Sequence, residues 1–300
     1  MKLDHIHEIK GKIFLSTKVK SSNLLDGAYK SIFKGKSLDF EELREYTVGD
    51  NVKDIDWRAS ARSLKVLIRE HIADKKHNVF FVLDSKYDMN ANANDDEIKR
   101  DICINAAGTL AYLAYKNGDN TGAIFMENDM PMFFPLRQQL FHIENYLTFY
   151  DENLKNQKLK KRKIIENSIN DSLKYIVSYL LKKSIVFIIT DLYGIETIDE
   201  ELIKSLSYRN DLMIINIKDI NLYNSKAYDI ENRRYFAKMI SKNRKLARLE
   251  EEEKERVFNE ACDRFKKYRI NLISIESIDE VIPKIIELIN QHNSLINKKS

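Results

Sequence analysis

Short apolar runs alternate with long amphipathic segments over residues 78 to 296, and this alternation limits the folds open to the chain. Residues 79–83 form a near-continuous apolar run that is too short for a helix and rich in strand-forming residues. Similar runs lie at 122–126, 185–189, 212–217 and 270–275. Helical periodicity marks the segments at about 95–117, 137–150, 165–182, 198–208, 244–268 and 279–295. The alternation predicts a doubly wound, mostly parallel α/β sheet with helices on both faces.

The first part of the chain has a different pattern. Its apolar residues are sparser, and turn signals such as Gly27, Gly35 and Gly49 are frequent. We therefore expect two parts: an N-terminal subdomain of short strands and turns over residues 1–76, packed on an α/β domain over residues 77–300.

The composition is that of a compact protein. The chain has 300 residues, with 50 Lys and Arg against 46 Asp and Glu, and its 8 Gly and 3 Pro exclude collagen-like and low-complexity chains. No run approaches the roughly 20 apolar residues of a membrane span, and the first residues carry charges where a signal peptide needs an apolar core. We expect a cytoplasmic protein without a membrane span, in which Cys103 and Cys262 are packed thiols.

Two basic clusters raise the question of nucleic acid. Lysine and arginine crowd residues 155–163 and 233–248, and such rows can neutralise phosphates. Glutamates at 250–253 directly follow the second cluster and can pair with it at helical spacing. A solvated or partner-facing helix surface is therefore favoured, and binding of nucleic acid is the less favoured alternative.

Acidic residues follow two of the expected strands. Asp84 comes directly after the run at 79–83, with Asp88 in the adjoining loop, and Asp191 follows the run at 185–189. If the two strands are neighbours, these carboxylates lie on one rim of the sheet, where ligands of doubly wound sheets bind. Clustered carboxylates attract a hard cation such as Mg²⁺ or Mn²⁺. The alternative is that each aspartate caps the turn or helix after its strand.

A long motif precedes the first expected strand of the sheet. It reads Arg-x-Tyr-x-x-Gly-Asp, then Ile-Asp-Trp-Arg and Ala-Arg, and its positions in this chain are Arg44, Tyr46, Gly49, Asp50, Asp56, Trp57, Arg58 and Arg62. This run strongly resembles the signature of the domain-of-unknown-function family 58, with Lys53 where that family usually has Arg. The resemblance implies a sheet domain similar to the von Willebrand factor type A domain.

The motif also has a physical interpretation. Arg44, Arg58 and Arg62 lie near acidic residues in the sequence, and bidentate pairs between them would hold a turn-rich segment together. Trp57 is the only tryptophan, and we expect it to be a core anchor that joins the N-terminal segment to the sheet. The motif is therefore interpreted as architectural first and partner-binding second.

The resemblance implies a metal-ion-dependent adhesion site. In type A domains this site uses Asp-x-Ser-x-Ser after the first strand, a threonine from a later loop, and an aspartate after the fourth strand. Asp84 matches the first position and Asp191 the last, but the two serine positions fall on Lys86 and Asp88. The threonine has no clear match. Two interpretations therefore stay open. The first is a degenerate metal site of Asp84, Asp88 and Asp191. The second is a salt-bridged relic of that site, because a lysine ammonium repels a cation.

The same resemblance implies a function. Family members are thought to act with MoxR-type AAA+ ATPases in the assembly or maturation of protein complexes. We therefore expect a non-enzymatic adaptor that binds such an ATPase and a client protein, with Lys86, Ser85 and Thr190 as partner contacts. A magnesium-dependent phosphoester hydrolase that uses Asp84, Asp88 and Asp191 is the alternative. The sequence contains no nucleophile elbow, phosphate loop or dinucleotide fingerprint.

Overall fold

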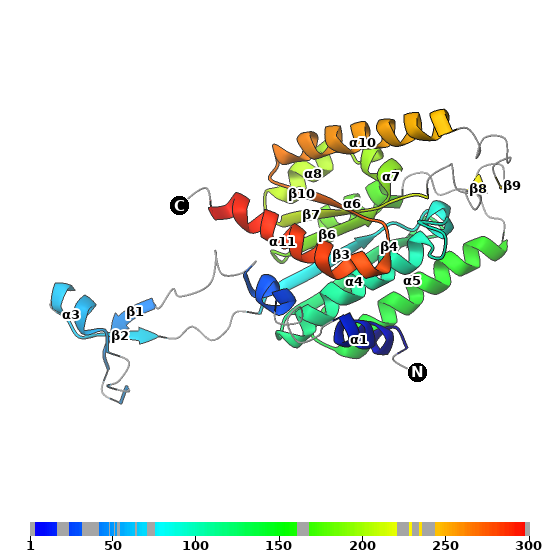
Figure 1. Cartoon of the computed structure of the whole chain (residues 1–300). Coiled ribbons are helices and arrows are strands. Elements are labelled where there is room, and N and C mark those ends of the chain that lie inside the picture. The colour runs from blue at the N-terminus through cyan, green and yellow to red at the C-terminus, as the bar shows by residue number, and fades with distance from the viewer. Residues whose placement is uncertain are drawn as a thin grey trace.

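A six-stranded sheet between two layers of helices forms the main body of the protein (Figure 1). The computed structural model describes residues 4–16, 24–31, 42–47, 49–50, 52, 55–63, 65–70, 76–160, 168–220, 228–229, 234–235 and 244–297. The predicted α/β class is confirmed, because the sheet is mostly parallel and carries helices on both faces.

The strands of the sheet follow the apolar runs of the sequence. They are β3 (Asn78–Leu83), β4 (Asn120–Glu127), β5 (Met130–Arg137), β6 (Ile185–Thr190), β7 (Asp211–Ile217) and β10 (Asn271–Ile275). Their order across the sheet is β10-β7-β6-β3-β4-β5. β6 is buried along its whole length and β3 along all but its first residue, as strands covered on both faces must be.

β5 is a strand that the sequence analysis did not predict. It runs antiparallel to β4 at the edge of the sheet. Asn128 and Asp129 connect the two strands with φ angles of 51° and 64°, the left-handed conformation that tight hairpins need. Pro131 and Pro135 argue against a central strand, but proline is tolerated at an edge.

One layer of helices packs on the odd-numbered side chains of β3. It contains α1 (Asp4–Ser16), a helical segment at residues 24–31, α4 (Lys99–Lys116), α5 (Leu140–Lys160) and α11 (Val281–Asn297). The other layer packs on Phe80 and Val82 and contains α6 (Ser168–Tyr179), α7 (Leu192–Thr197), α8 (Glu200–Ser207) and α10 (Arg244–Lys266). Short elements complete the description: the 3-10 turns η2 (Tyr87–Asn90) and η3 (Ile278–Glu280), and the pair β8 (Tyr228–Asp229) and β9 (Arg234–Tyr235).

The first helices correct the prediction for the N-terminal segment. Residues 4–16 and 24–31 are helical rather than strands and turns, and their apolar side chains, among them Ile6, Ile9 and Tyr29, belong to the core of the sheet domain. The Glu144 carboxylate of α5 accepts hydrogen bonds from the backbone N–H groups of His5 and Ile6, which fixes the start of α1 on the sheet domain.

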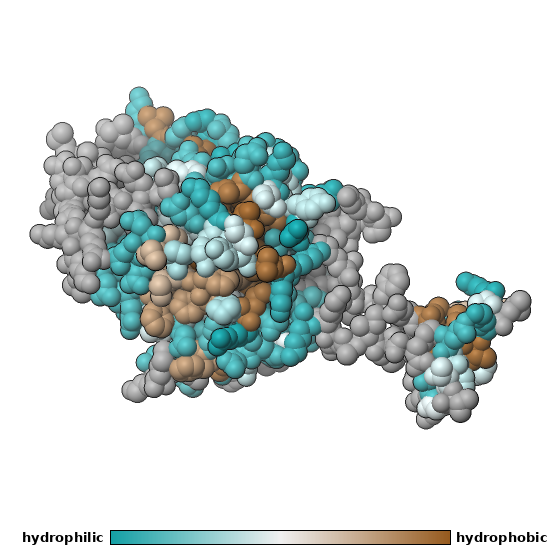
Figure 2. All heavy atoms as spheres, turned by 180° about the vertical axis from the view of Figure 1, so that it is seen from behind, coloured by the Kyte–Doolittle hydropathy of each residue, from teal (hydrophilic) through white to brown (hydrophobic). Residues whose placement is uncertain are grey.

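The predicted short strands occur later, around the motif. β1 (Glu42–Glu45) and β2 (Leu67–Glu70) form an antiparallel pair, and α3 (Trp57–Ser63) packs beside β2. This unit lies to one side of the sheet domain in both views (Figure 1, Figure 2). The boundary at residue 76 stays a prediction.

Hydrophilic residues cover much of the sheet domain seen from behind, with a hydrophobic patch among them (Figure 2). Within the described ranges, no helix combines the length and the apolar character needed to cross a membrane.

Candidate functional site

The two central strands, β3 and β6, end side by side. Leu83 is paired with Ile189 in their parallel register, and the Asp84 amide donates to the Ile189 carbonyl at 3.0 Å. The chain continues from β3 to β4 on one side and from β6 to β7 on the other, so the strand order reverses here. Ligands of doubly wound sheets bind at the carboxyl ends of strands at such a switch point. The structure thus places Asp84 and Asp191 on one rim, as the sequence predicts for neighbouring strands.

The carboxylate of Asp84 is fully buried and accepts three hydrogen bonds. Its Oδ1 accepts from the Lys86 backbone N–H at 3.0 Å and from the Ser168 hydroxyl at 2.6 Å, and its Oδ2 accepts from the Thr190 hydroxyl at 2.5 Å. These donors compensate for much of the solvation that the carboxylate loses on burial. Asp84 is therefore held rigidly at the centre of the rim.

Ser168 is a member of the site that the sequence analysis missed. It is the first residue of α6, and its oxygen accepts from the Ser85 amide at 3.3 Å while its hydroxyl donates to Asp84. The sequence signal that could have found it is a serine at the start of an expected helix, where such residues commonly cap.

Ser85 and Thr190, which the sequence analysis named as partner contacts, are both fully buried. The Ser85 hydroxyl accepts from the Met126 amide at 3.0 Å, and its carbonyl accepts from the Gln157 side chain at 3.1 Å. In this conformation the two side chains serve the interior of the site, and their predicted contact with a partner stays a prediction.

Lys86 is the unusual side chain of the rim. It is 2% exposed, and its ammonium Nζ lies 3.7 Å from Asp84 Oδ2 but has no hydrogen-bond partner among the described residues. The ring of Tyr193, at the start of α7, lies over it with Nζ 4.6 Å from the ring centroid. Tyr193 itself is 55% exposed. A buried ammonium without an acceptor is costly, and such a group in a native structure calls for a physical reason.

A second lysine, Lys99 at the start of α4, neutralises the other rim aspartate. Its Nζ donates to Asp191 Oδ2 at 2.7 Å and to Asp219 Oδ1 at 2.5 Å. Burial opposes the charge of Lys99, but Asp191 and Asp219 outweigh burial and raise its pKa. Burial alone would likewise raise the pKa of Asp191, but the ammonium groups of Lys99 and Lys86 lower it below its ordinary value. Both groups of the pair are therefore charged at neutral pH.

Asp191 also shapes the turn that follows it. Its Oδ1 accepts from the Gly194 amide at 2.9 Å, which makes Asp191 the N-cap of α7. The capping role that the sequence left open as the alternative is therefore present, together with the ion pair to Lys99.

Asp88 lies on η2, beside these groups and partly buried. Burial raises the pKa of Asp88, and the nearby charges of Lys99 and Lys86 offset this only in part. The negative charge of Asp88 is therefore less favourable in the folded protein than that of a solvated aspartate.

The described donor set does not fit a divalent cation. Both oxygens of Asp84 already accept hydrogen bonds, and the two ammonium groups lie against the carboxylates that would ligate a metal. Over the described residues, no group of three or more His, Cys, Asp or Glu side chains is placed to hold a metal ion. The contacts instead match the salt-bridged alternative, in which lysine supplies the positive charge.

The comparison with known families covers this site and the motif before it. The family "Protein of unknown function DUF58" matches residues 42–224, more than half of the chain. The chain belongs to the DUF58 family. Its similar curated relatives include uncharacterized proteins Rv1480 and MT1527 of Mycobacterium tuberculosis and Mb1516 of Mycobacterium bovis. Each is 29% identical over 110 residues, which is 37% of this chain and 34% of the relative. The match therefore spans about a third of each relative's length.

The DUF58 signature residues lie in the unit of β1, β2 and α3. Asp56 caps α3 by accepting from the backbone N–H groups of Arg58 and Ala59, each at 3.0 Å. Asp50 Oδ2 accepts from the Thr47 amide and hydroxyl, each at 2.9 Å, and Gly49 next to it has a φ of 115°, a backbone conformation that glycine adopts readily. The Tyr46 amide donates to the Val66 carbonyl at 2.8 Å.

The environments of other signature side chains differ from the prediction, or these side chains lie outside the described residues. Trp57 is 66% exposed, so the expected core anchor is wrong: the residue begins α3 on the outside of its unit. Arg58 and Arg62 are exposed as well. The side chain of Arg44 lies outside the described residues, and the expected arginine–aspartate pairs stay a prediction.

Part of the basic clusters is neutralised within the chain. Lys155 pairs with Asp151 at 2.5 Å, and Arg248 pairs with Glu252 at 2.7 Å, each one helical turn away. Residues 161–163, 233 and 236–243 of these clusters lie outside the described residues. The pair of Arg248 and Glu252 is that of a solvated helix surface, whereas Asp151 is buried and pairs with Arg100 as well.

Proposed function

We propose that this DUF58 chain is a non-enzymatic docking protein whose sheet domain is similar to the von Willebrand factor type A domain. The strand order, with one antiparallel edge strand and aspartates at the switch point, supports the likeness. The partner in this proposal is a MoxR-type AAA+ ATPase, with which the protein acts on the assembly or maturation of other protein complexes.

The observation that carries the proposal is the environment of Lys86. Its ammonium is buried beside Asp84 and donates to no hydrogen-bond acceptor in the described part of the chain. In a type A domain, a bound metal completes recognition by taking a carboxylate from the partner. Here the Lys86 ammonium would take the same carboxylate, because it carries the positive charge and three N–H donors at that position.

Tyr193 controls access to Lys86 in this proposal. The aromatic face holds the ammonium through a cation–π contact, and the ring is exposed enough to swing into solvent. An incoming aspartate or glutamate would replace the ring over Lys86. The neighbouring pair of Lys99 and Asp191 stays in place and keeps the rest of the rim neutral.

An adaptor role is also favoured over bond-making chemistry by the state of the carboxylates. Asp84 is engaged by three donors and Asp191 by Lys99, so neither is poised as a general base. These contacts suit a rigid binding surface better than a proton-transfer site.

The test is a binding assay between the purified full chain and the MoxR-type ATPase of the same genome, measured by biolayer interferometry. Replacing Lys86→Met is expected to weaken binding about tenfold or more, the effect of losing a charge-assisted hydrogen bond. The exposed Lys204→Met on α8 is the matched control and leaves binding unchanged.

The Tyr193→Ala variant provides a second test, which does not depend on whether the Lys86→Met variant folds. It uncovers Lys86, so we expect faster association with the ATPase, while Tyr193→Phe behaves as the wild type. Equal binding by the wild type and both the Lys86→Met and Tyr193→Ala variants, with folding confirmed by circular dichroism, would overturn the proposal.

A further inference from the structure

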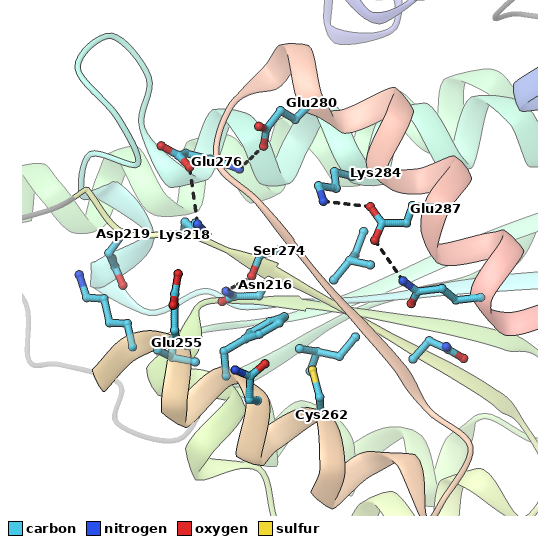
Figure 3. A pocket seen from close by; sticks show the side chains of 18 of the residues that line it. Asn216, Lys218, Asp219, Glu255, Cys262, Ser274, Glu276, Glu280, Lys284 and Glu287 are labelled. Atoms are coloured by element: carbon cyan, nitrogen blue, oxygen red, sulfur yellow. Dashed lines mark hydrogen bonds and ion pairs between the residues drawn. The ribbon is translucent and has the colours of Figure 1, made fainter. Parts of the chain in front are cut away.

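A groove separate from the Lys86 site lies between α10 and α11, with β10 at its base (Figure 3). Its volume is about 770 Å³, and the residues of β10 line it together with the carboxyl end of β7. Most of it lies beyond the segment that matches the DUF58 family.

β10 is an edge strand of the sheet, and its residues line this groove. In a parallel pair, alternate residues turn both their N–H and C=O groups to the neighbouring strand. The Ile275 carbonyl accepts from the Lys218 amide at 2.9 Å, so Ile275, Ile273 and Asn271 face β7. Leu272 and Ser274 therefore turn their backbone groups outward, where no described residue bonds to them. An open edge of this kind is a template for another strand.

A buried side-chain oxygen at the base of the groove accepts no hydrogen bond from the described residues. Asn216 on β7 is 3% exposed; its Nδ2 donates to the Ser274 hydroxyl at 2.7 Å, while its Oδ1 has no partner among the described residues. Asn216 and Ser274 lie together at the centre of the groove (Figure 3). A buried acceptor without a donor favours a ligand that brings an N–H group.

The walls of the groove select for positive charge. They carry six carboxylates and four lysine ammonium groups, and one of these carboxylates, that of Asp219, is already paired with Lys99. Lys218 pairs with Glu276 and Lys284 with Glu287 inside the groove, whereas Lys254 pairs with Glu250 outside it. Glu255 of α10 is exposed and points into the space beside Asp219 (Figure 3). The acidic excess complements a basic ligand.

We infer that this groove binds an extended, basic peptide segment of a partner protein, which adds as a strand to the free edge of β10. Backbone groups of the peptide pair with Leu272 and Ser274, a donor of the peptide reaches Asn216 Oδ1, and its basic side chains meet the acidic walls. This inference goes beyond the proposed function, because it uses neither Lys86 nor the carboxylates beside it.

The probe is a fluorescein-labelled heptapeptide of alternating lysine and valine, titrated against the full chain by fluorescence anisotropy. We expect saturable binding. A peptide with N-methyl groups on the bonding edge is expected to bind about tenfold more weakly, since it lacks the backbone donors, and an alternating glutamate and valine peptide is expected not to bind.

Cys262 gives a readout on the native protein, because it lines the groove and is half-buried, whereas Cys103 is buried in the core. Saturating lysine–valine peptide is expected to slow the reaction of Cys262 with a thiol reagent, with Cys103 unreactive throughout.

Matched variants on α10 locate the contact. Glu255→Lys reverses a charge in the groove and is expected to weaken binding of the lysine–valine peptide at least threefold, about 0.7 kcal/mol. Glu252→Lys makes the same charge change on the same helix outside the groove and is expected to leave binding unchanged.

Equal binding of the parent and N-methylated peptides, or unprotected Cys262 at saturation, would overturn the inference. Lys86→Met binds the peptide as the wild type does, so failure here and failure of the ATPase test are distinguishable.

Discussion

The hydroxyl of Thr190 donates a hydrogen bond of 2.5 Å to Asp84 Oδ2 and so joins the ends of β6 and β3. Gly194 lies directly against this bond, because a Cβ atom at that position would lie 1.8 Å from Thr190 Oγ1 and 2.9 Å from Asp84 Oδ2. The first turn of α7 can thus approach the rim only if residue 194 has no side chain.

The Gly194→Ala variant tests this relationship. The added methyl group must displace the Thr190 hydroxyl, so the variant loses a hydrogen bond to a buried carboxylate and strains the turn. We expect a loss of about 2–4 kcal/mol in the free energy of unfolding, measured by urea denaturation. Gly27→Ala is the control: it is helical, with nothing within 4 Å of an added Cβ, and should be neutral or slightly stabilising. Equal stability of the two variants would contradict the geometry.

Lys99 holds two carboxylates, and its removal tests whether the rim depends on lysine for its positive charge. Lys99→Met leaves Asp191 buried beside Asp219 without its ammonium, so we expect the unfolding free energy to fall by about 3–5 kcal/mol. Adding Asp191→Asn should restore part of this loss, because the stranded charge is removed. The exposed pair of Lys174 and Asp171, 3.1 Å apart, provides the control, and Lys174→Met should cost about 1 kcal/mol or less. A small effect at both lysines would mean that the buried pair contributes little.

Asp88 predicts a dependence of stability on pH. Folding raises its pKa, chiefly through burial, so the charged carboxylate is less favourable in the folded than in the unfolded protein. As the pH rises from the ordinary value of 3.8 through the raised pKa, the Asp88 carboxylate therefore lowers the unfolding free energy. Asp88→Asn should be more stable than the wild type at pH 7, and the two should converge below pH 3.8. Urea denaturation across this range measures the difference, and a gap that does not change with pH would rule out this cause.

The sequence predicted the parts of the fold that depend on local pattern. Apolar runs identified β3, β4, β6, β7 and β10, because strands covered on both faces need continuous apolar residues. β5 was missed because its two prolines argue against a strand, although an edge position tolerates them. The helix at residues 4–16 was missed because its buried face rests on α4 and α5, far away in the sequence.

In the candidate site, too, the sequence predicted what depends on local pattern and missed what depends on residues far apart in the chain. Strand ends place Asp84 and Asp191 on one rim, which the sequence predicts once the strands are neighbours. The partners of these aspartates come from elsewhere: Ser168 is 84 residues from Asp84, and Lys99 is 92 residues from Asp191. No local sequence pattern marks such pairs, because the two partners meet only in the folded protein, where the buried environment strengthens the interaction between them. The sequence analysis already set Lys86 against the metal interpretation, but it did not place Lys99 beside Asp191.

Trp57 provides the last prediction, because its environment differs from the sequence-based expectation. It is the only tryptophan of the chain and is 66% exposed at the start of α3, so its fluorescence reports on the β1–β2–α3 unit alone. We expect acrylamide to quench this fluorescence in the folded protein nearly as well as in urea, and Trp57→Phe to change the unfolding free energy by about 0.5 kcal/mol or less, as is usual for an exposed side chain. Tyr29→Phe is the buried comparison: it removes the hydroxyl that donates to Asp119 at 2.7 Å and should cost about 1.5–3 kcal/mol. Strong protection of Trp57 from acrylamide, with a large loss of stability on its replacement, would restore the core-anchor interpretation.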